Sequence, residues 1–324
     1  MSYKIVSLDS KNEWNKALSG IRHSFCHTWE YCYAMHLSTG FQTYLFCFEK
    51  DGVRIVSSLT EKKFEEYQDL SKPFGFNGFA GNGYHPGFLS EWNRFISEKK
   101  YVSGYLGLHP VFGVNGLFDS SEIYHYNNVY VLDLKPNHEE ILNNMSNGRK
   151  NQLLKFDEIS PKLSEDRIAI KNFFLDHYND FLKRRKAKSF YYLSAESISY
   201  LFSIKNILVI GAFEMGKCVA ASLFGYTKQI GVGLYHVSLP GAEHYSAHLV
   251  WYAAKKLKSI GIPTLNLGGG TGGIAKFKKR FGTDVYPLKC VKQVYRKDIY
   301  DSLCQEINAD PNDFDGFFPS YRKK

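Results

Sequence analysis

The stretch that decides the fold runs from Leu265 to Gly282 and reads LNLGGGTGGIAKFKKRFG. An apolar run ends in three successive glycines, Gly268, Gly269 and Gly270, and a short basic segment follows. Glycines at the end of a strand permit positive φ and let a ligand or another backbone come close. The stretch therefore predicts a strand, a tight turn and a short basic helix, at a place where an anionic substrate can lie.

A nucleotide cradle is the first alternative, because Gly268, Gly270 and Gly273 have the spacing of the dinucleotide-binding fingerprint. That fingerprint also needs a long helix and an acidic residue at the end of the next strand. The helix expected from Ile274 ends by Gly282, and too little chain remains for further βαβ units. A dinucleotide-dependent oxidoreductase is thus the least favoured class, and Ile274 replaces the lysine that a P-loop requires.

Length and composition limit the classes of protein to which this chain can belong. The chain has 324 residues, of which 44% are hydrophobic and 23% charged, which is typical of a globular protein and long enough for two domains. It has no run of eighteen apolar residues and no signal-like start, so we expect neither a membrane span nor secretion. Six scattered cysteines without a C-x-x-C pair favour a reducing, cytoplasmic setting.

The formal charge of +9 favours anionic partners. Basic residues cluster in LKRRKAK (182–188), KKLK (255–258), KFKKR (276–280) and the tail, mostly in the second half of the chain. We expect any anion-binding surface to lie there. Each run can equally be the solvated face of a helix.

The chain is duplicated in its pattern. An apolar helix-like segment, FCHTWEYCYAMHL, precedes two strand-like runs that meet at Asp51 and Gly52. The segment SAESISYLF likewise precedes two apolar runs that meet at Met215 and Gly216. The pattern predicts two similar α/β halves, with a boundary at about Met145, after the strand VYVLDL ends at Pro136.

The second half has a clear element order. We expect a helix over 164–186, the helix and hairpin just described, a strand over 230–237, the loop SLPGAEH, and a helix over 245–261. The strand TLNL, the glycine stretch and the strand LKCVKQVY then follow.

These motifs together resemble FemAB-like and BioF2-like proteins of the GNAT acyltransferase superfamily. The resemblance is carried by LNLGGGTGGIAKFKKRFG with its Phe-Lys-x-x-Phe-Gly signature, and by SNGRKNQLLKFDE, FFLDHYNDFLKRRKAKSFYYLS, GKCVAASLF and YHVSLPGAEHYSAHLVWYAAKKLKSIGI. FCHTWEY, PFGFNGF and GYLGLHP agree more loosely. It implies two tandem GNAT-like domains, 1–145 and 146–324, each a mixed, largely antiparallel sheet flanked by helices. The substrate cleft would come mostly from the second domain.

The resemblance also implies acyl or aminoacyl transfer to an amino group. The donor would be an acyl-CoA or an aminoacyl-tRNA, without a tightly bound cofactor, and the acceptor a peptidoglycan or surface-polysaccharide precursor. No DNA is implied, and peripheral membrane contact stays open. The turn SLPGAEHYSAHL lacks the glycine-spaced sequence with which typical GNAT enzymes hold coenzyme A, and the long helical arm of some relatives is absent. The helix start can still bind an anion, so the predicted donor-binding residues are Ser238, His244, Tyr245, Ser246 and Ala247.

The chemistry needs proton removal from an amine and stabilisation of an oxyanion. On the strand GLYHV, Tyr235 and His236 point to opposite faces, so one lines a given side and the other is core. His236 suits a general base, and Tyr235 is the alternative as a substrate-orienting hydroxyl; the substrate itself can also lose the proton. Lys278, at the edge of the face formed by Ile274, Phe277 and Phe281, is the predicted charge contact and the third catalytic candidate.

Further residues are candidates for substrate binding. Arg149 and Lys150 could bind a phosphate or carboxylate, and Tyr191 and Tyr192 could stack on a base or sugar, while a surface helix and core aromatics are the structural alternatives. Phe277 and the glycines 268–270 complete the predicted substrate site.

A metal site and a non-catalytic binding module are two further interpretations. His23, Cys26, His27, Cys32 and His36 lie close in sequence but match no closed zinc pattern, so we predict no metal. A non-catalytic module that binds RNA or an anionic glycan is the alternative to a transferase, and it predicts strongly salt-dependent binding without a product.

Overall fold

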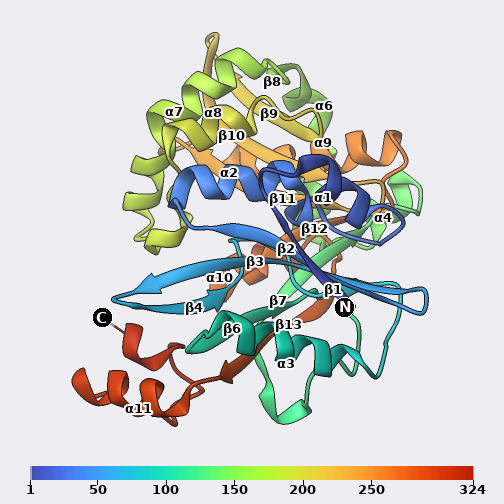
Figure 1. The fold of residues 1–324 in the computed structure, drawn as a ribbon. Coiled ribbons are helices and arrows are strands. Elements are labelled where there is room, and N and C mark those ends of the chain that lie inside the picture. The colour runs from blue at the N-terminus through green and yellow to red at the C-terminus, as the bar shows by residue number, and fades with distance from the viewer. Residues whose placement is uncertain (1, 324) are drawn as a thin grey trace. The chain divides into compact units, whose positions relative to one another are not determined.

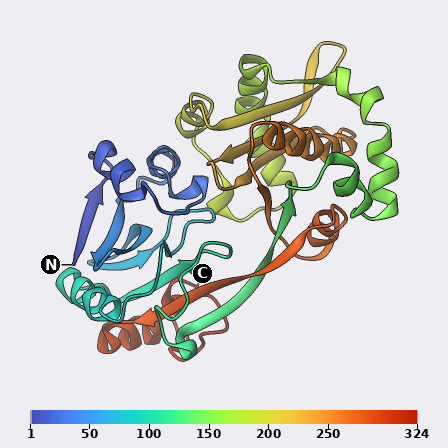
Figure 2. The ribbon, with the colours of Figure 1, turned by 90° about the vertical axis from the view of Figure 1, so that its right-hand side faces the viewer.

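The computed structural model describes residues 2–323 and has a mixed α/β fold. By packing, the chain divides into two compact units. Unit 1 holds the chain up to His23, His27–Asn127 and the residues from Pro287 on, and unit 2 holds Ser24–Cys26 and Asn128–Tyr286. The last part of the chain thus belongs to the same unit as its start, as Figure 2 shows for the blue first strand and the red last helix. The domain boundary at Met145 stays a prediction.

Unit 2 is a sheet with helices (Figure 1). It contains the second part of β7 (Ile123–Asp133), α4 (His138–Asn143), α5 (Asn147–Leu154), α6 (Phe156–Ile159), β8 (Leu163–Ser164), α7 (Arg167–Arg184), α8 (Ala195–Leu201), β9 (Ile207–Glu214), β10 (Lys217–Tyr226), β11 (Gly231–Ser238), α9 (Ser246–Ser259), β12 (Thr264–Gly269) and α10 (Gly272–Lys279). The strand order is β7-β12-β11-β10-β9-β8. All these neighbours are antiparallel except β11 and β12, which are parallel and joined through α9.

Local sequence explains these elements. The β9–β10 hairpin turns at Met215 and Gly216, both with positive φ, as the predicted turn requires. In α9 the apolar side chains recur with helical spacing, and Trp251 and Leu257 are buried in one cluster with Phe224 and Leu265 of the sheet. This packing fixes the first turn of α9 beside the end of β11.

Unit 1 is also a sheet with helices. Its elements are β1 (Tyr3–Ser7), α1 (Lys11–Leu18), α2 (Trp29–Thr39), β2 (Thr43–Lys50), β3 (Val53–Phe64), β4 (Tyr67–Ser71), β5 (Ala80–Gly81), α3 (Phe88–Lys99), β6 (Ser103–Leu108), most of β13 (Asp284–Val294) and α11 (Lys297–Glu306). The strand order is β1-β2-β3-β4-β6-β13, with β5 beside β3. Trp92 of α3 lies at the centre of an aromatic core, with its ring centroid 5.2 Å from that of Phe46 and 5.3 Å from that of Phe79.

The two units share an element order. In unit 1 the hairpin β2–β3 leads to β4, α3 and then β6, which is parallel to β4. In unit 2 the hairpin β9–β10 leads to β11, α9 and β12, which is parallel to β11. The predicted fold class of two similar α/β halves is therefore confirmed. No helix in the described part of the chain is long and apolar enough to cross a membrane.

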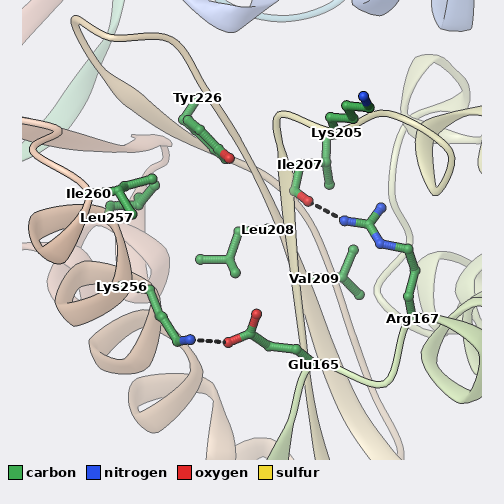
Figure 3. Close-up of a pocket in the computed structure, with 10 residues that line it drawn as sticks. All are labelled: Glu165, Arg167, Lys205, Ile207, Leu208, Val209, Tyr226, Lys256, Leu257 and Ile260. Carbon is green, nitrogen blue, oxygen red and sulfur yellow. Dashed lines mark hydrogen bonds and ion pairs between the residues drawn. The ribbon is translucent and has the colours of Figure 1, made fainter.

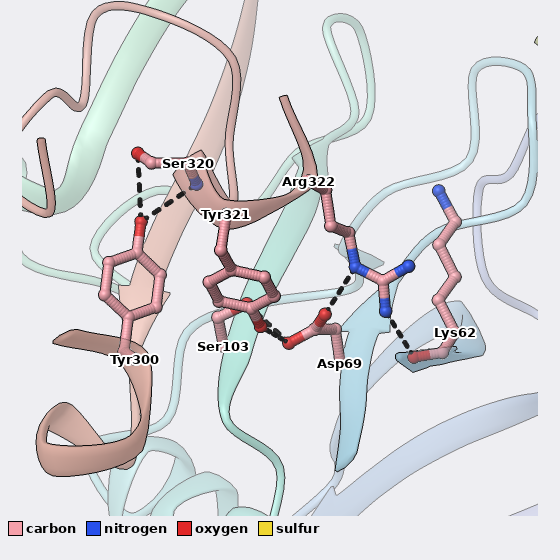
Figure 4. Close-up of polar contacts among 7 residues, drawn as sticks. All are labelled: Lys62, Asp69, Ser103, Tyr300, Ser320, Tyr321 and Arg322. Atoms are coloured by element: carbon pink, nitrogen blue, oxygen red, sulfur yellow. Dashed lines mark hydrogen bonds and ion pairs between the residues drawn. The ribbon is translucent and has the colours of Figure 1, made fainter. Parts of the chain in front are cut away.

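A buried polar cluster attaches the end of the chain within unit 1 (Figure 4). The Asp69 carboxylate accepts hydrogen bonds from the hydroxyls of Ser103, at 2.8 Å, and Tyr321, and from Nε of Arg322, at 2.7 Å. Arg322 also donates to the carbonyl of Lys62, at 2.9 Å. Because the Asp69 side chain is only 4% exposed, these donors replace the water that its charge has lost.

Candidate active site

The site is built where β11 and β12 separate. The two strands are paired only at Gly231 with Leu265 and at Val232 with Asn266, although β11 continues to Ser238 and β12 to Gly269. Beyond these pairs the strands no longer hydrogen-bond to each other. An opening between parallel strands in the middle of a sheet presents backbone donors and acceptors to a substrate.

A bulge shapes the β12 side of this opening. The register of β12 against β7 shifts between Asn266 and Gly269, and Gly268 has φ +82°, which favours glycine. The Gly268 N–H donates to Oδ1 of Asn266 at 2.7 Å. Asn266 is fully buried, and its Nδ2 has no hydrogen-bond partner among the described residues. A buried amide donor is thus available beside the opening.

His236 is held by two hydroxyl groups on the β11 side. Its Nδ1 lies 2.8 Å from Oγ of Ser222 on β10, and its Nε2 lies 3.2 Å from Oγ of Ser246, the first residue of α9. Burial, aided by the charge of Arg185, lowers the pKa of His236 to about 4, so the ring is neutral at pH 7. Tyr235 is buried and packs edge-on against Tyr178 of α7.

The other predicted donor-binding residues surround the start of α9. Among the described residues no side chain caps this helix, which continues directly from a short 3₁₀ turn at Glu243–Tyr245, and Ala247 is buried at its start. Ser238 is buried with an unpartnered Oγ, and its carbonyl accepts from Nη2 of Arg184 at 3.0 Å. Tyr245 donates to Glu214 at 2.8 Å, and the exposed His244 ring lies against it with centroids 4.1 Å apart.

Lys278 lies on α10, close after the glycine turn. Its Nζ donates to the carbonyl oxygen of Gly269 at 2.5 Å, and the lysine forms no ion pair within residues 2–323. Burial lowers the pKa of Lys278 to about 8. The side chain is therefore an ammonium that can lose its proton near neutral pH. At the same turn, a side chain on Gly270 would collide with Ile274.

The remaining predicted residues have different surroundings. Arg149 is 1% exposed and lies between the rings of Phe277 and Phe281. Lys150 donates to Oδ1 of Asn143, Tyr191 is 39% exposed, and Tyr192 is half-buried. The structure brings together His236, Ser238, Tyr245, Ser246 and Ala247 at the β11 side, and Gly268, Gly269, Gly270, Phe277 and Lys278 at the β12 side. Their substrate contacts stay predictions.

Sequence reasoning missed three residues of the site. Ser222 and Asn266 are single polar residues within apolar runs, which is a usable signal for a strand that faces a polar site. Arg184 lies in the basic run 182–188, and the sequence does not indicate that it reaches the end of β11.

A cavity of about 290 Å³ lies near the start of β9 (Figure 3). Three of its charged side chains already have partners: Lys256 pairs with Glu165 at 2.8 Å, and Arg167 donates to the carbonyl of Ile207 at 2.5 Å. We assign no function to it. No group of three or more metal-ligating side chains occurs among the described residues.

The fold is shared with several solved structures. FemX matches with a TM-score of 0.67 and 12% identity, over 93% of this chain and 99% of FemX. The C-terminal domain of a putative lysylphosphatidylglycerol synthetase from Agrobacterium fabrum matches with a TM-score of 0.58 and 10% identity, over 92% and 96% of the two chains. L-PGS from Bacillus licheniformis matches with a TM-score of 0.56 and 12% identity, over 88% of this chain and 92% of that chain.

These likenesses establish the fold. The predicted resemblance to FemAB-like proteins is confirmed at the level of the fold. No protein-family model and no curated protein sequence matches the chain.

Proposed function

We propose that this protein transfers an acyl or aminoacyl group from an activated ester or thioester to an amino group of a cell-envelope precursor. The observation that carries the proposal is Lys278, a half-buried lysine of α10 that forms no ion pair within residues 2–323 and donates to the last residue of β12, a strand that borders the opening of the sheet. The shared fold with FemX supports the same class.

The donor is proposed to enter between β11 and β12. Its anionic part, the phosphates of a CoA or of a tRNA end, would meet the uncapped start of α9 at Ser246 and Ala247. The buried hydroxyl of Ser238 and Nδ2 of Asn266 have no hydrogen-bond partner within residues 2–323 and can bind polar atoms of the donor's reactive end.

The reaction follows from the neighbouring groups. The amine nitrogen attacks the donor carbonyl carbon, and the carbonyl oxygen becomes an oxyanion that the Lys278 ammonium stabilises. The proton of the attacking amine passes to the Ser246 hydroxyl, whose own proton passes to Nε2 of His236. As the carbon–oxygen or carbon–sulfur bond breaks, Lys278 donates a proton to the leaving atom. A pKa near 8 suits a general acid that works at neutral pH.

The acceptor is proposed to be an amine of a peptidoglycan or surface-polysaccharide precursor made in the cytoplasm. Phosphate or carboxylate groups on such a precursor are chemically suited to Lys150 and the other basic side chains of unit 2. Tyr191 and Tyr192 are proposed to contact its base or sugar.

A ligand screen followed by a transfer assay tests the function. Coenzyme A, acyl-CoAs, nucleotide sugars, NAD(H) and charged tRNA are first added during thermal unfolding. A ligand at 100 times its Kd stabilises by about 2.7 kcal/mol, which at about two to four degrees per kcal/mol is a shift of roughly five to eleven degrees. Donors that bind are then mixed with nucleotide-linked peptidoglycan precursors, and products are weighed by mass spectrometry. Salt-sensitive RNA binding with no product from any donor would contradict the proposal in favour of a binding module.

A further inference from the structure

Arg149 of α5 is enclosed rather than directed to solvent. Its guanidinium carbon lies 4.5 Å from the ring centroid of Phe277 and 4.3 Å from that of Phe281, both in or next to α10. Nη1 donates to Oε1 of Gln152 at 2.6 Å, and Nη2 donates to the carbonyl of Phe277 at 3.3 Å. Burial lowers the pKa of Arg149 to about 10, so it stays charged at pH 7.

The carbonyl that Arg149 reaches belongs to the last turn of α10. An α-helical bond from the N–H of Phe281 would satisfy the Phe277 carbonyl, but this N–H donates to the carbonyl of Lys278 at 3.1 Å instead. Carbonyls in the last turn of a helix need partners from outside the helix. Arg149 supplies one for Phe277.

The segment before α5 supplies further contacts to the same turn. The N–H of Ser146 donates to the carbonyl of Arg280 at 3.0 Å, and Nε of Arg280 approaches the Ser146 hydroxyl at 3.4 Å. At Gly282, where φ is +70°, a side chain would collide with the carbonyl oxygen of Asn144. Residues 144–149, more than 120 positions earlier in the chain, thus contact the end of α10.

From these contacts we propose that Arg149 is a positioning residue, which clamps the last turn of α10 and so holds the Lys278 ammonium against the carbonyl of Gly269. The inference rests on the proposed catalytic role of Lys278. The sequence predicts that Arg149 binds a substrate anion, whereas this proposal gives the buried guanidinium a structural task. Its two phenyl contacts are cation–π interactions, which strengthen when they are shielded from water.

The clamp has a measurable consequence. Lys278 has a low pKa because it is buried, so an α10 that loosens and admits water should return the lysine toward its ordinary value of 10.5. The other charged side chains of its helical segment, Lys276, Lys279 and Arg280, are cations. Burial is the cause of the low pKa of Lys278, so the expected rise follows from the entry of water.

The test compares Arg149→Met, which keeps much of the volume but loses every donor, with Arg149→Lys, which keeps a charge and one donor group. Arg167→Met is the matched control, because Arg167 is also bound to backbone carbonyls, those of Phe202 and Ile207, elsewhere in unit 2. Lys278 is titrated in each protein by its pH-dependent reaction with acetic anhydride, followed on the Lys278 peptide by mass spectrometry. Circular dichroism reports folding.

We expect the midpoint for Lys278 to rise by at least one pH unit in Arg149→Met, to rise less in Arg149→Lys, and to stay unchanged in Arg167→Met. An unchanged midpoint in folded Arg149→Met overturns the clamp. Failure of both Arg149 variants to fold also overturns it, because Arg149 would then serve folding as a whole. Since the titration needs no substrate, a transfer-active Lys278→Ala would refute the proposed role of the lysine without touching this result.

Discussion

Nζ of Lys278 lies 2.5 Å from the carbonyl oxygen of Gly269, nine residues earlier in the chain. This contact closes the glycine turn between β12 and α10, and it directs a half-buried cation toward the end of the strand that borders the opening. Within residues 2–323 this ammonium donates one hydrogen bond, to a backbone carbonyl, so it keeps donor capacity for a substrate, since a lysine has three N–H groups.

Lys278→Ala should lower kcat of the transfer reaction by about 100-fold or more, because the loss of one preorganised oxyanion donor costs that much in other acyl-transfer sites. The substrate Kd should change little. Single-turnover rates measure the effect, and Lys279→Ala, an exposed neighbour on α10, is the matched control with expected wild-type rates. Equal losses in both variants would mean that net charge, and not the position of Lys278, matters.

The pH dependence of transfer should have a basic limb near pH 8, because the reaction needs Lys278 protonated. No acid limb should occur between pH 5 and 7, since His236, with a pKa of about 4, is already neutral there. Profiles of kcat against pH test both statements. A rate that rises through pH 8 would instead make Lys278 a base.

The free energy of unfolding should also depend on the titration of Lys278. Because its pKa is lowered in the folded protein, the charged form destabilises the fold, whereas a lysine in a salt bridge stabilises it. The unfolded chain binds the Lys278 proton more tightly than the folded one between pH 8 and 10.5, so the free energy of unfolding rises with pH in that window. At pH 7 the half-buried ammonium costs up to about 3 kcal/mol. Lys278→Met should therefore be more stable than wild type at pH 7, and urea unfolding at pH 7 and 10 should show that its advantage shrinks.

Much of this site follows from sequence, and the remainder depends on long-range contacts. Gly268 is predictable because glycines at the end of an apolar run indicate a turn, and Lys278 because it lies at the edge of the face formed by Ile274, Phe277 and Phe281. The opening between β11 and β12 arises from pairing between segments that are distant in sequence, which periodicity does not encode. The interior position of Arg149 has the same origin, since nothing within its own helix predicts the two rings that Phe277 and Phe281 bring to it.

Ser246→Ala should reduce kcat by about 10- to 100-fold, because it removes the hydroxyl that links the attacking amine to His236. Ser222→Ala should act less, through the orientation of the ring. Ser259→Ala at the other end of α9 serves as the control, since its exposed hydroxyl donates to the carbonyl of Lys256 in the same helix. If Ser246→Ala keeps full activity while His236→Gln loses it, the proton passes to the histidine directly.

The Asp69 cluster should determine the stability of unit 1 without affecting chemistry in unit 2. Asp69→Asn leaves Arg322 without its charge partner, and the loss of one member of a buried pair costs about 3–5 kcal/mol. Tyr321→Phe should cost about 1–2 kcal/mol, since it leaves the carboxylate with one donor fewer. Asp301→Asn, which breaks the exposed pair with Lys297, should change stability by less than about 1 kcal/mol.

The double variant Asp69→Asn/Tyr321→Phe distinguishes a network from independent contacts. Because both side chains meet in one hydrogen bond, the two costs should fall short of additivity by about 0.5–3 kcal/mol. Urea unfolding followed by tryptophan fluorescence measures the cycle, with Trp92 in the core of unit 1 as one of the reporters. Additive costs would mean that the C-terminal tail is held chiefly by its apolar contacts, those of Tyr321 with Phe64 and Tyr300.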